Sequence, residues 1–437
     1  MRRFAVLLAV LIASRADLAV PAQSLSSSPC DSSPLVVLST TVWTSRGLLT
    51  NRDVLFRDGR VAAIEPAGSS KYPGVRRLEG SGNTLLPGLV DAHLHFVIPG
   101  GLPTKDGPRT DIEELTARQL LRSGVTSGRV HLATLDEAAR LKKRSLDPCA
   151  AIPRLQVGGP GLSGALDKDF NNFQGVKSGE DAAAKIDRLR AAGAEWVAIH
   201  DADKFDAGIL QSIATAARAA GLRIMAAGST PQEIAAVLTI RPDTLDYFDR
   251  TAEPTYPQAT LDLIKAQSDL ILVPTPGVPY RTVEYLRNPG LLESPGNFES
   301  LDPTDRAFML ANARKDLAGA EGTRAQRVIA SLPEKIRQLR RLLLPMAIGS
   351  DAGSPLQFPS GAIWWELEAW RSTGASHDDV LRAATDDGAA VLRVKDVGNL
   401  NLGSRADFVL YRGSVTTGPF ELSRVMAVGK AGVVFKE

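Results

Sequence analysis

The sequence predicts an α/β fold, a (β/α)8 TIM-like barrel with a small β-sandwich formed by the N- and C-terminal segments. From about residue 85, apolar strand-like runs alternate with helical runs, which is typical of a parallel sheet covered by helices. Eight such units in roughly 270 residues correspond to one barrel. Short strands with turn signals precede and follow this region, which indicates a separate β unit made from both chain ends.

The overall composition is typical of a soluble globular protein. The chain has 437 residues, of which 44% are hydrophobic and 23% charged, enough for a large domain and a smaller one. Its formal net charge of +2 argues against nucleic acid or an anionic membrane surface as a partner. We therefore expect a small-molecule substrate, with no nucleic-acid or membrane partner. The sequence leaves open whether identical chains associate into a homo-oligomer.

The first residues have the layout of a secretory signal peptide. Arg2 and Arg3 precede an apolar run over 4–13, and small residues up to Ala22 form a cleavage site. The run is too short to span a bilayer. The sequence thus predicts a signal peptide over 1–22 and a periplasmic or secreted protein.

The chain has only two cysteines, Cys30 and Cys149. In an oxidising compartment they either form a disulfide or remain separate thiols. Their spacing does not decide between these readings, because disulfide geometry is spatial.

Three segments follow the signal peptide: one part of the β-sandwich over 23–84, the barrel over 85–394, and the other part over 395–437. Asp58-Gly59 is a hairpin turn signal within the first of these. Because the two β segments flank the barrel, we expect their strands to join. These strands are expected at 35–38, 41–43, 53–56, 60–64, 408–411, 425–428 and 433–435.

The barrel strands are expected near 85–91, 125–131, 152–157, 195–200, 222–227, 243–248, 270–275 and 343–350. The helices between them are expected at 111–123, 134–145, 179–192, 207–220, 230–239 and 258–267. The seventh unit carries an insertion over about 276–342, with a part rich in Pro, Gly and Asn followed by two helices. This insertion either shapes the substrate entrance or is a peripheral decoration.

The first barrel strand ends in a His-x-His pair, His93 and His95. Residues two apart on a strand point to the same face, so both imidazoles can reach one ion. A catalytic zinc typically takes three protein ligands and a water, and such a pair would supply two of them. The alternative is two hydrogen-bonded histidines without a metal.

Five stretches resemble the amidohydrolase superfamily, and within it the imidazolonepropionase-like, prolidase-like branch. They are Leu86-Pro87-Gly88-Leu89-Val90-Asp91-Ala92-His93-Leu94-His95, Gly124-Val125-Thr126-Ser127, Ile348-Gly349-Ser350-Asp351-Ala352-Gly353, Ala383-Ala384-Thr385 and Leu402-Gly403-Ser404-Arg405-Ala406-Asp407-Phe408-Val409-Leu410. They follow the family order and cover nearly the whole mature chain. The resemblance implies a metal-bearing barrel with a β-sandwich built from both chain ends.

The resemblance also implies functional residues. His93 and His95 would be metal ligands, and Asp351 would be both a ligand and the catalytic acid/base. These three residues match the usual number of protein ligands for a catalytic zinc.

The metal site is nevertheless degenerate. The family usually adds a Lys on the fourth strand and a His on each of the fifth and sixth strands. This chain has Ala198, Ala227 and Tyr247 at those positions. We therefore expect one divalent metal ion, zinc, rather than two.

Three further residues are candidates. His200 shares the inward face of Ala198 and is either a fourth ligand or a loop histidine that contacts solvent or substrate. Tyr247 is either a hydrogen-bond donor in the transition state or an inert aromatic residue at the barrel rim. Arg129 is a candidate substrate anchor.

Two functions are compatible with these residues. The first is a metal-dependent hydrolase that cleaves a carbon–nitrogen bond with metal-activated water, in a non-peptide amide, a cyclic amide or a dipeptide-like substrate. The second is a catalytically inactive binding protein on the same fold, because fold does not imply function. A serine hydrolase or thiol redox enzyme has no support, since the chain lacks G-x-S-x-G and C-x-x-C motifs.

Overall fold

The computed structural model describes residues 30–96, 109–169, 172–247, 251–299 and 301–436. The chain divides into two compact units, 1–31 and 32–437, and all elements below belong to the second unit. The predicted signal peptide over 1–22 lies outside the described residues. Within them, no helix is long and apolar enough to cross a membrane. Cys30 and Cys149 both lie within the described residues, and neither is a free thiol.

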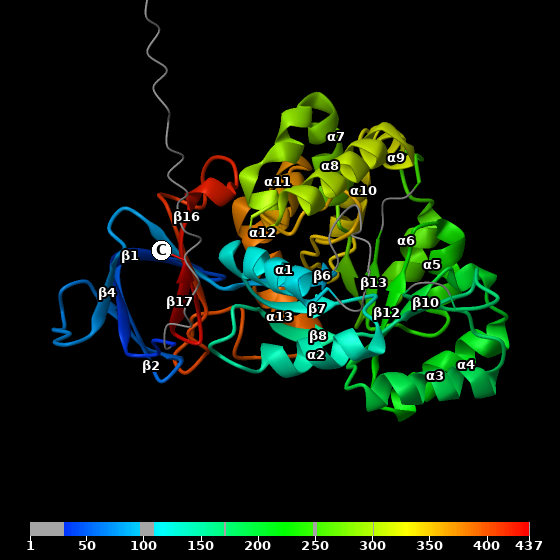
Figure 1. Ribbon diagram of the computed structural model, residues 1–437, viewed down its shortest axis with the longest axis horizontal. Helices are drawn as coiled ribbons and strands as arrows, with labels where there is room; N and C mark the ends of the chain where they lie inside the picture. The colour runs from blue at the N-terminus through cyan, green and yellow to red at the C-terminus, as the bar shows by residue number, and fades with distance from the viewer. Residues whose placement is uncertain (1–29, 97–108, 170–171, 248–250, 300, 437) are drawn as a thin grey trace, which may run out of the picture. The chain divides into compact units, whose positions relative to one another are not determined.

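The two ends of the second unit form one eight-stranded sheet, so the expected joining of the β segments is confirmed (Figure 1). β15 of the C-terminal segment pairs antiparallel with β5 of the N-terminal segment. Phe56 of β2 stacks on Phe408 of β15 with ring centroids 4.8 Å apart, although other strands separate them in the sheet. The sheet therefore curves around its own apolar core. Its strands are β1 (Leu35–Thr44), β2 (Gly47–Arg57), β3 (Arg60–Pro66), β4 (Arg76–Glu79), β5 (Thr84–Pro87), β15 (Phe408–Tyr411), β16 (Val425–Lys430) and β17 (Val433–Lys436).

The chain passes from this sheet into the barrel at Gly88. The sequence predicts one strand near 85–91, whereas the structure has β5 up to Pro87 and β6 (Leu89–Leu94) in different sheets. A Cβ atom at Gly88 would lie 2.2 Å from the Thr126 hydroxyl oxygen. Only glycine therefore allows the backbone to turn so close to the next barrel strand.

Eight parallel strands close the barrel, as predicted. Seven of them are β6, β7 (Val125–Val130), β8 (Arg154–Val157), β11 (Trp196–His200), β12 (Arg223–Ala227), β13 (Thr244–Asp246) and β14 (Ile271–Val273). The eighth is the segment 345–352, which bridges Leu272 of β14 at Met346 and Leu94 of β6 at Ala352. A bridge between Gly158 and Trp196 joins the third and fourth strands. The short strands β9 (Gly161–Ser163) and β10 (Phe173–Gln174) extend the sheet beside β11.

Most of the helices cover the outside of the barrel. They are α1 (Thr110–Arg122), α2 (Leu135–Ser145), α3 (Gly179–Ala191), α4 (Ala207–Ala219), α5 (Pro231–Leu238), α6 (Gln258–Lys265), α10 (Leu332–Arg341), α11 (Ala362–Ser372), α12 (His377–Ala383) and α13 (Asp386–Leu392). Short 3-10 turns occur at Ala202–Lys204, Pro289–Glu293, Pro295–Asn297 and Leu422–Arg424. The six helices predicted between the first seven strands are all present.

The insertion differs from the prediction. It contains α7 (Gly277–Arg287) ahead of the Pro-rich part, and then α8 (Pro303–Ala318) and α9 (Ala320–Val328) before α10. Pro279 lies in the first turn of α7, where a missing N–H is tolerated, so it does not break the helix. Leu339 of α10 belongs to the main barrel core, which makes α10 a barrel helix rather than part of the insertion.

The buried carboxyl group of Glu137 gives a pH-dependent stability prediction. Glu137 forms a capping box with Thr134 at the start of α2, and burial raises its pKa from 4.5 to about 7. Because the folded pKa is the higher one, wild-type stability falls as the pH rises from about 4.5 through 7. Glutamine serves the same capping box without a charge. We expect Glu137→Gln to be stabilising at pH 8, by up to about 3 kcal/mol, and nearly neutral at pH 4.

Urea unfolding of both proteins at pH 4 and pH 8 checks this expectation. Glu114→Gln, at an exposed glutamate of α1, serves as the control and should show no such pH dependence. An equal difference between wild type and Glu137→Gln at the two pH values would contradict the prediction.

Candidate metal centre

Two barrel strands bring the three predicted ligands together. His93 lies in β6 and His95 follows directly after its end. The eighth strand carries Asp351, whose amide donates to the His93 carbonyl at 2.9 Å. A Cβ atom at Gly349 would lie 2.7 Å from the Cβ atom of His93. The glycine therefore lets the eighth strand approach β6 closely enough for the Asp351 carboxylate to reach both imidazoles.

The ligand atoms of these residues converge on one point. Oδ1 of Asp351 lies 2.9 Å from Nε2 of His95 and 3.4 Å from Nε2 of His93. All three side chains are buried, and their ligand atoms lie within 4.8 Å of one another. The sequence thus identified a group that is capable of holding a metal ion.

The other ring nitrogens of both histidines bind acceptors. Nδ1 of His93 lies 2.6 Å from a carboxylate oxygen of Asp246, and Nδ1 of His95 lies 3.0 Å from the backbone carbonyl of His131. Since both partners only accept, each Nδ1 carries the hydrogen, and each Nε2 of a neutral ring presents its lone pair to the site. Carboxylates and backbone carbonyls are the usual partners that orient metal-ligating histidines.

The Tyr247 hydroxyl lies among the three ligand atoms. Its oxygen is 2.6 Å from Nε2 of His93, 3.0 Å from Oδ1 of Asp351 and 3.5 Å from Nε2 of His95. With neutral histidines, three acceptor atoms share the single hydrogen of this hydroxyl. A divalent cation would resolve this excess of acceptors, so the donor set fits a metal such as zinc.

The pKa shifts agree with a site that attracts positive charge. Burial alone would lower the pKa of His93, but its bonds to the Asp246 and Asp351 carboxylates raise the pKa overall. Burial would raise the pKa of Asp351, but hydrogen bonds from His93 and His95 outweigh it and the pKa is lowered. Positive charge on the His93 ring and negative charge on Asp351 therefore stabilise each other.

Among the described residues, the other group of converging ligand atoms is poorly suited to a second ion. His93, His131 and Asp246 also form a group with converging ligand atoms. However, the Arg129 guanidinium lies 2.6 Å from the same Asp246 oxygen that binds His93. Its positive charge already neutralises Asp246 and disfavours a second cation.

Arg129 does not lie where a substrate anchor would, which corrects the sequence expectation. The side chain is fully buried and donates to the Ala92 carbonyl, the Thr244 hydroxyl and the Asp246 carboxylate. Its guanidinium also stacks on Trp196 at 4.5 Å. All of these partners belong to the chain itself, so Arg129 crosslinks strands inside the barrel.

His200 also differs from the expectation of a fourth ligand. Among the described residues, it is not part of either group of converging ligand atoms. Its ring packs edge-on against Phe173 at 5.0 Å, and its centroid is 6.2 Å from that of Tyr247. The ring thus lies beside Phe173 and Tyr247, outside both groups of converging ligand atoms.

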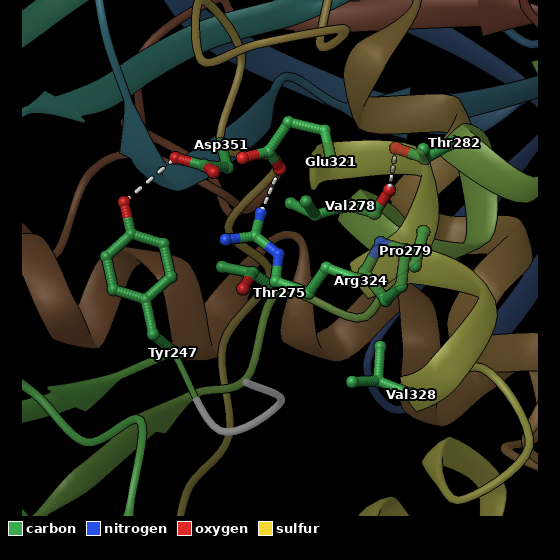
Figure 2. Close-up of a pocket in the computed structure, with 10 residues that line it drawn as sticks. Tyr247, Thr275, Val278, Pro279, Thr282, Glu321, Arg324, Val328 and Asp351 are labelled. Carbon is green, nitrogen blue, oxygen red and sulfur yellow. Dashed lines mark hydrogen bonds and ion pairs between the residues drawn. The ribbon is translucent and has the colours of Figure 1, made fainter. Parts of the chain in front are cut away.

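A small pocket reaches the candidate metal centre. Asp351 and Tyr247 line it on one side, and α7 and α9 of the insertion line it on the other. Figure 2 shows the Tyr247 hydroxyl pointing at Asp351, with the ion pair of Arg324 and Glu321 beyond it. The insertion therefore forms one wall of the pocket beside the candidate metal centre, which is the position that the first of its two readings requires.

Sequence reasoning missed two features of this site. The sequence assigns no role to Asp246, which precedes Tyr247 at the position of the missing sixth-strand histidine. In the structure it orients the His93 ring. Arg324 is the cation of the pocket wall, and it lies in an insertion without any recognisable motif. Inward alternation along the sixth strand could have suggested Asp246, because it lies two residues after Thr244, another inward side chain.

Comparison with known proteins agrees with this architecture. The sequence profile of the Amidohydrolase family matches residues 84–434. An imidazolonepropionase from Salinispora arenicola is 25% identical over 382 residues, which is 83% of this chain and 86% of that protein. An adenine deaminase from Paracoccus denitrificans is 41% identical over 64 residues, but this match spans only 14% of the chain and 10% of that relative.

Solved structures show the same fold. A Xaa-Pro dipeptidase with bound methionine superposes with a TM-score of 0.72 at 16% identity, covering 93% of this chain and 100% of that one. A putative prolidase from Bifidobacterium longum has a TM-score of 0.70 at 20% identity, covering 93% and 95%. These likenesses confirm the predicted barrel architecture.

Proposed function

Since this chain belongs to the amidohydrolase family, we propose that it is a hydrolase that cleaves a carbon–nitrogen bond of a small molecule with the help of one divalent metal ion. One observation carries the proposal. Nε2 of His93, Nε2 of His95 and Oδ1 of Asp351 converge, while each Nδ1 is bound to an oxygen that fixes its tautomer. In metalloenzymes, an oxygen acceptor on the second ring nitrogen orients a metal-ligating histidine in this way.

The proposed ion is held by His93, His95 and Asp351, with zinc as the favoured metal for two imidazoles and a carboxylate. When bound, it supplies Lewis acidity toward water and a substrate carbonyl. The chain does the rest of the chemistry. Asp246 keeps the His93 ring in place, and burial of the whole cluster excludes bulk water from it.

Asp351 is the residue that moves the proton. Its lowered pKa keeps it ionised at neutral pH. We assign it the role of proton acceptor because it is the carboxylate that both belongs to the ligand group and lines the pocket. Its Oδ2 accepts a hydrogen bond from the Ser354 hydroxyl at 2.8 Å, which fixes the carboxylate plane. Because Asp351 lines the pocket, it can pass that proton to the leaving nitrogen of a substrate held there.

The pocket wall supports a substrate with a negative group. Arg324 and Glu321 are partly exposed and face the pocket, so a substrate carboxylate could exchange with Glu321 as the partner of Arg324. We further propose a periplasmic or secreted location, which follows from the expected signal peptide.

A substrate panel tests the proposed function. We expect zinc-loaded protein to hydrolyse at least one class among Xaa-Pro dipeptides, N-acyl amino acids, lactams and aryl amides. Amidated counterparts without the free carboxylate should react more slowly. A chelator should remove the activity and zinc should restore it. Protein that holds its metal and hydrolyses none of these compounds would overturn the proposal and favour the inactive binding protein.

A further inference from the structure

We infer that the phenol oxygen of Tyr247 is a fourth protein ligand of the ion, completing a set of two nitrogens and two oxygens. This inference rests on the proposed metal site of His93, His95 and Asp351. It assigns Tyr247 a role that differs from both readings of the sequence, which were a hydrogen-bond donor to the transition state and an inert aromatic residue.

The distances describe a compressed tetrahedron. A tetrahedral zinc site with bonds of about 2.0–2.1 Å has its donor atoms about 3.3 Å apart. The Tyr247 oxygen lies 2.6, 3.0 and 3.5 Å from the donor atoms of His93, Asp351 and His95, respectively. The Asp351 oxygen lies 3.4 and 2.9 Å from those of the two histidines. Five of the six distances among the four donor atoms thus lie between 2.6 and 3.5 Å, near the separation that one ion would impose.

The three positions where family ligands are missing also agree with a single ion bound by Tyr247. The side chain of Tyr247 belongs to an apolar cluster that includes Ala198 and Ala227, the positions where the resemblance implies a Lys and a His. The aromatic ring therefore occupies apolar surroundings where a second ion would need polar ligands. Its hydroxyl extends out of this cluster to the first ion's position. The three departures from the family pattern then act together, as a conversion to a single-ion site.

The backbone supports a fixed position for the phenol. Tyr247 has a φ of 62°, in the left-handed region that non-glycine residues rarely adopt, and its amide donates to the Val273 carbonyl at 3.2 Å. Asp351, on the eighth strand, has a φ of 53°. Such conformations persist only where the surrounding structure holds them, so the backbone at both residues is fixed by its contacts.

The pocket side is where a reacting water would enter. Tyr247 and Asp351 line the pocket, whereas His93 is fully buried. Four protein ligands fill a tetrahedral zinc site, so a reacting water would have to be added as a fifth ligand, as happens in catalytic zinc sites that expand to five ligands. The pocket would deliver that water beside the two oxygen ligands.

Iron(III) is a suitable probe, because tyrosine oxygen is an established iron ligand and a phenolate bound to iron(III) absorbs visible light by charge transfer. We would load the full mature chain with iron(III), measure iron per chain by elemental analysis, and record the visible spectrum. Wild type should bind iron and show the band. Tyr247→Phe should lack the band and bind zinc on the order of 100-fold more weakly or worse, since even outer hydrogen-bond partners contribute 10–100-fold.

Two variants serve as controls. Tyr280→Phe, at a tyrosine of α7 that packs near Trp365, should keep the band. Tyr247→His should keep zinc affinity within about 10-fold, because imidazole also suits zinc, but should lack the band. If Tyr247 is a ligand, Tyr247→His should keep the zinc affinity that Tyr247→Phe loses. If its aromatic ring only supports the structure, the two variants should not differ in this way.

The outcomes are distinct. Wild type that binds iron at the site without a visible band, or a band that persists in Tyr247→Phe, would overturn the inference and leave the proposed function standing. Wild type that binds neither iron nor zinc would overturn both.

Discussion

Replacing Asp351 with asparagine is expected to lower kcat/KM about 10³-fold while the fold stays intact. Asparagine has the same shape and keeps an oxygen to accept the Tyr247 hydroxyl, which lies 3.0 Å from Oδ1 in the wild type. It cannot accept a proton from water at neutral pH, so the acid/base step is lost. The measurement is kcat/KM on the substrate of the panel that wild type hydrolyses fastest, together with thermal unfolding by circular dichroism.

The Asp351→Asn experiment needs two controls, a measurement of bound metal and a variant at another carboxylate. Because Asp351 is also a proposed ligand, the metal content of the variant is measured beside its activity. Asp203→Asn removes a carboxylate just after β11 that pairs with Lys204 at 2.6 Å, and it should leave turnover unchanged. Unchanged turnover in Asp351→Asn would instead contradict the assigned role of Asp351.

Replacing Asp246 with asparagine is expected to destabilise the fold by about 3–5 kcal/mol. The change leaves the Arg129 guanidinium, which is fully buried, without its ionic partner at 2.6 Å. A buried charge without compensation carries the full cost of its lost hydration. Thermal and urea unfolding measure the effect.

A double variant measures the interaction energy between Arg129 and Asp246. Arg129→Met combined with Asp246→Asn removes both charges and should recover much of the loss, which shows as a coupling energy. Glu284→Gln breaks an exposed pair with Arg287 on α7 and should cost less than about 1 kcal/mol. If Asp246→Asn were as stable as wild type, the buried pair would not have the importance given to it here.

The architecture was largely predictable because local patterns decide it. The Asp58-Gly59 turn, the strand-helix alternation and the amphipathic helices each reflect local preferences that the fold respects. The break at Gly88 was not predictable, since it depends on the approach of Thr126 from the neighbouring strand. The helix α7 was missed because Pro279 resembles a helix breaker, although it occupies a first turn.

The site was predictable only where residues share a strand or a motif. His93, His95 and Asp351 were found from strand alternation and family motifs, and the structure brings them together. Strand alternation could have placed Asp246 inside the barrel, but its contacts with His93 and Arg129 depend on which strands face each other across the interior, and no local pattern encodes that.

The most direct test of the central claim is elemental analysis of metal in the mature, untagged protein beside the double variant His93→Ala/His95→Ala. A working one-metal site predicts about one zinc or similar ion per chain in wild type and none in the double variant. No metal in either sample, even after incubation with zinc or manganese, would contradict the claim and would mean that the ligands missing at the other barrel strands were indispensable.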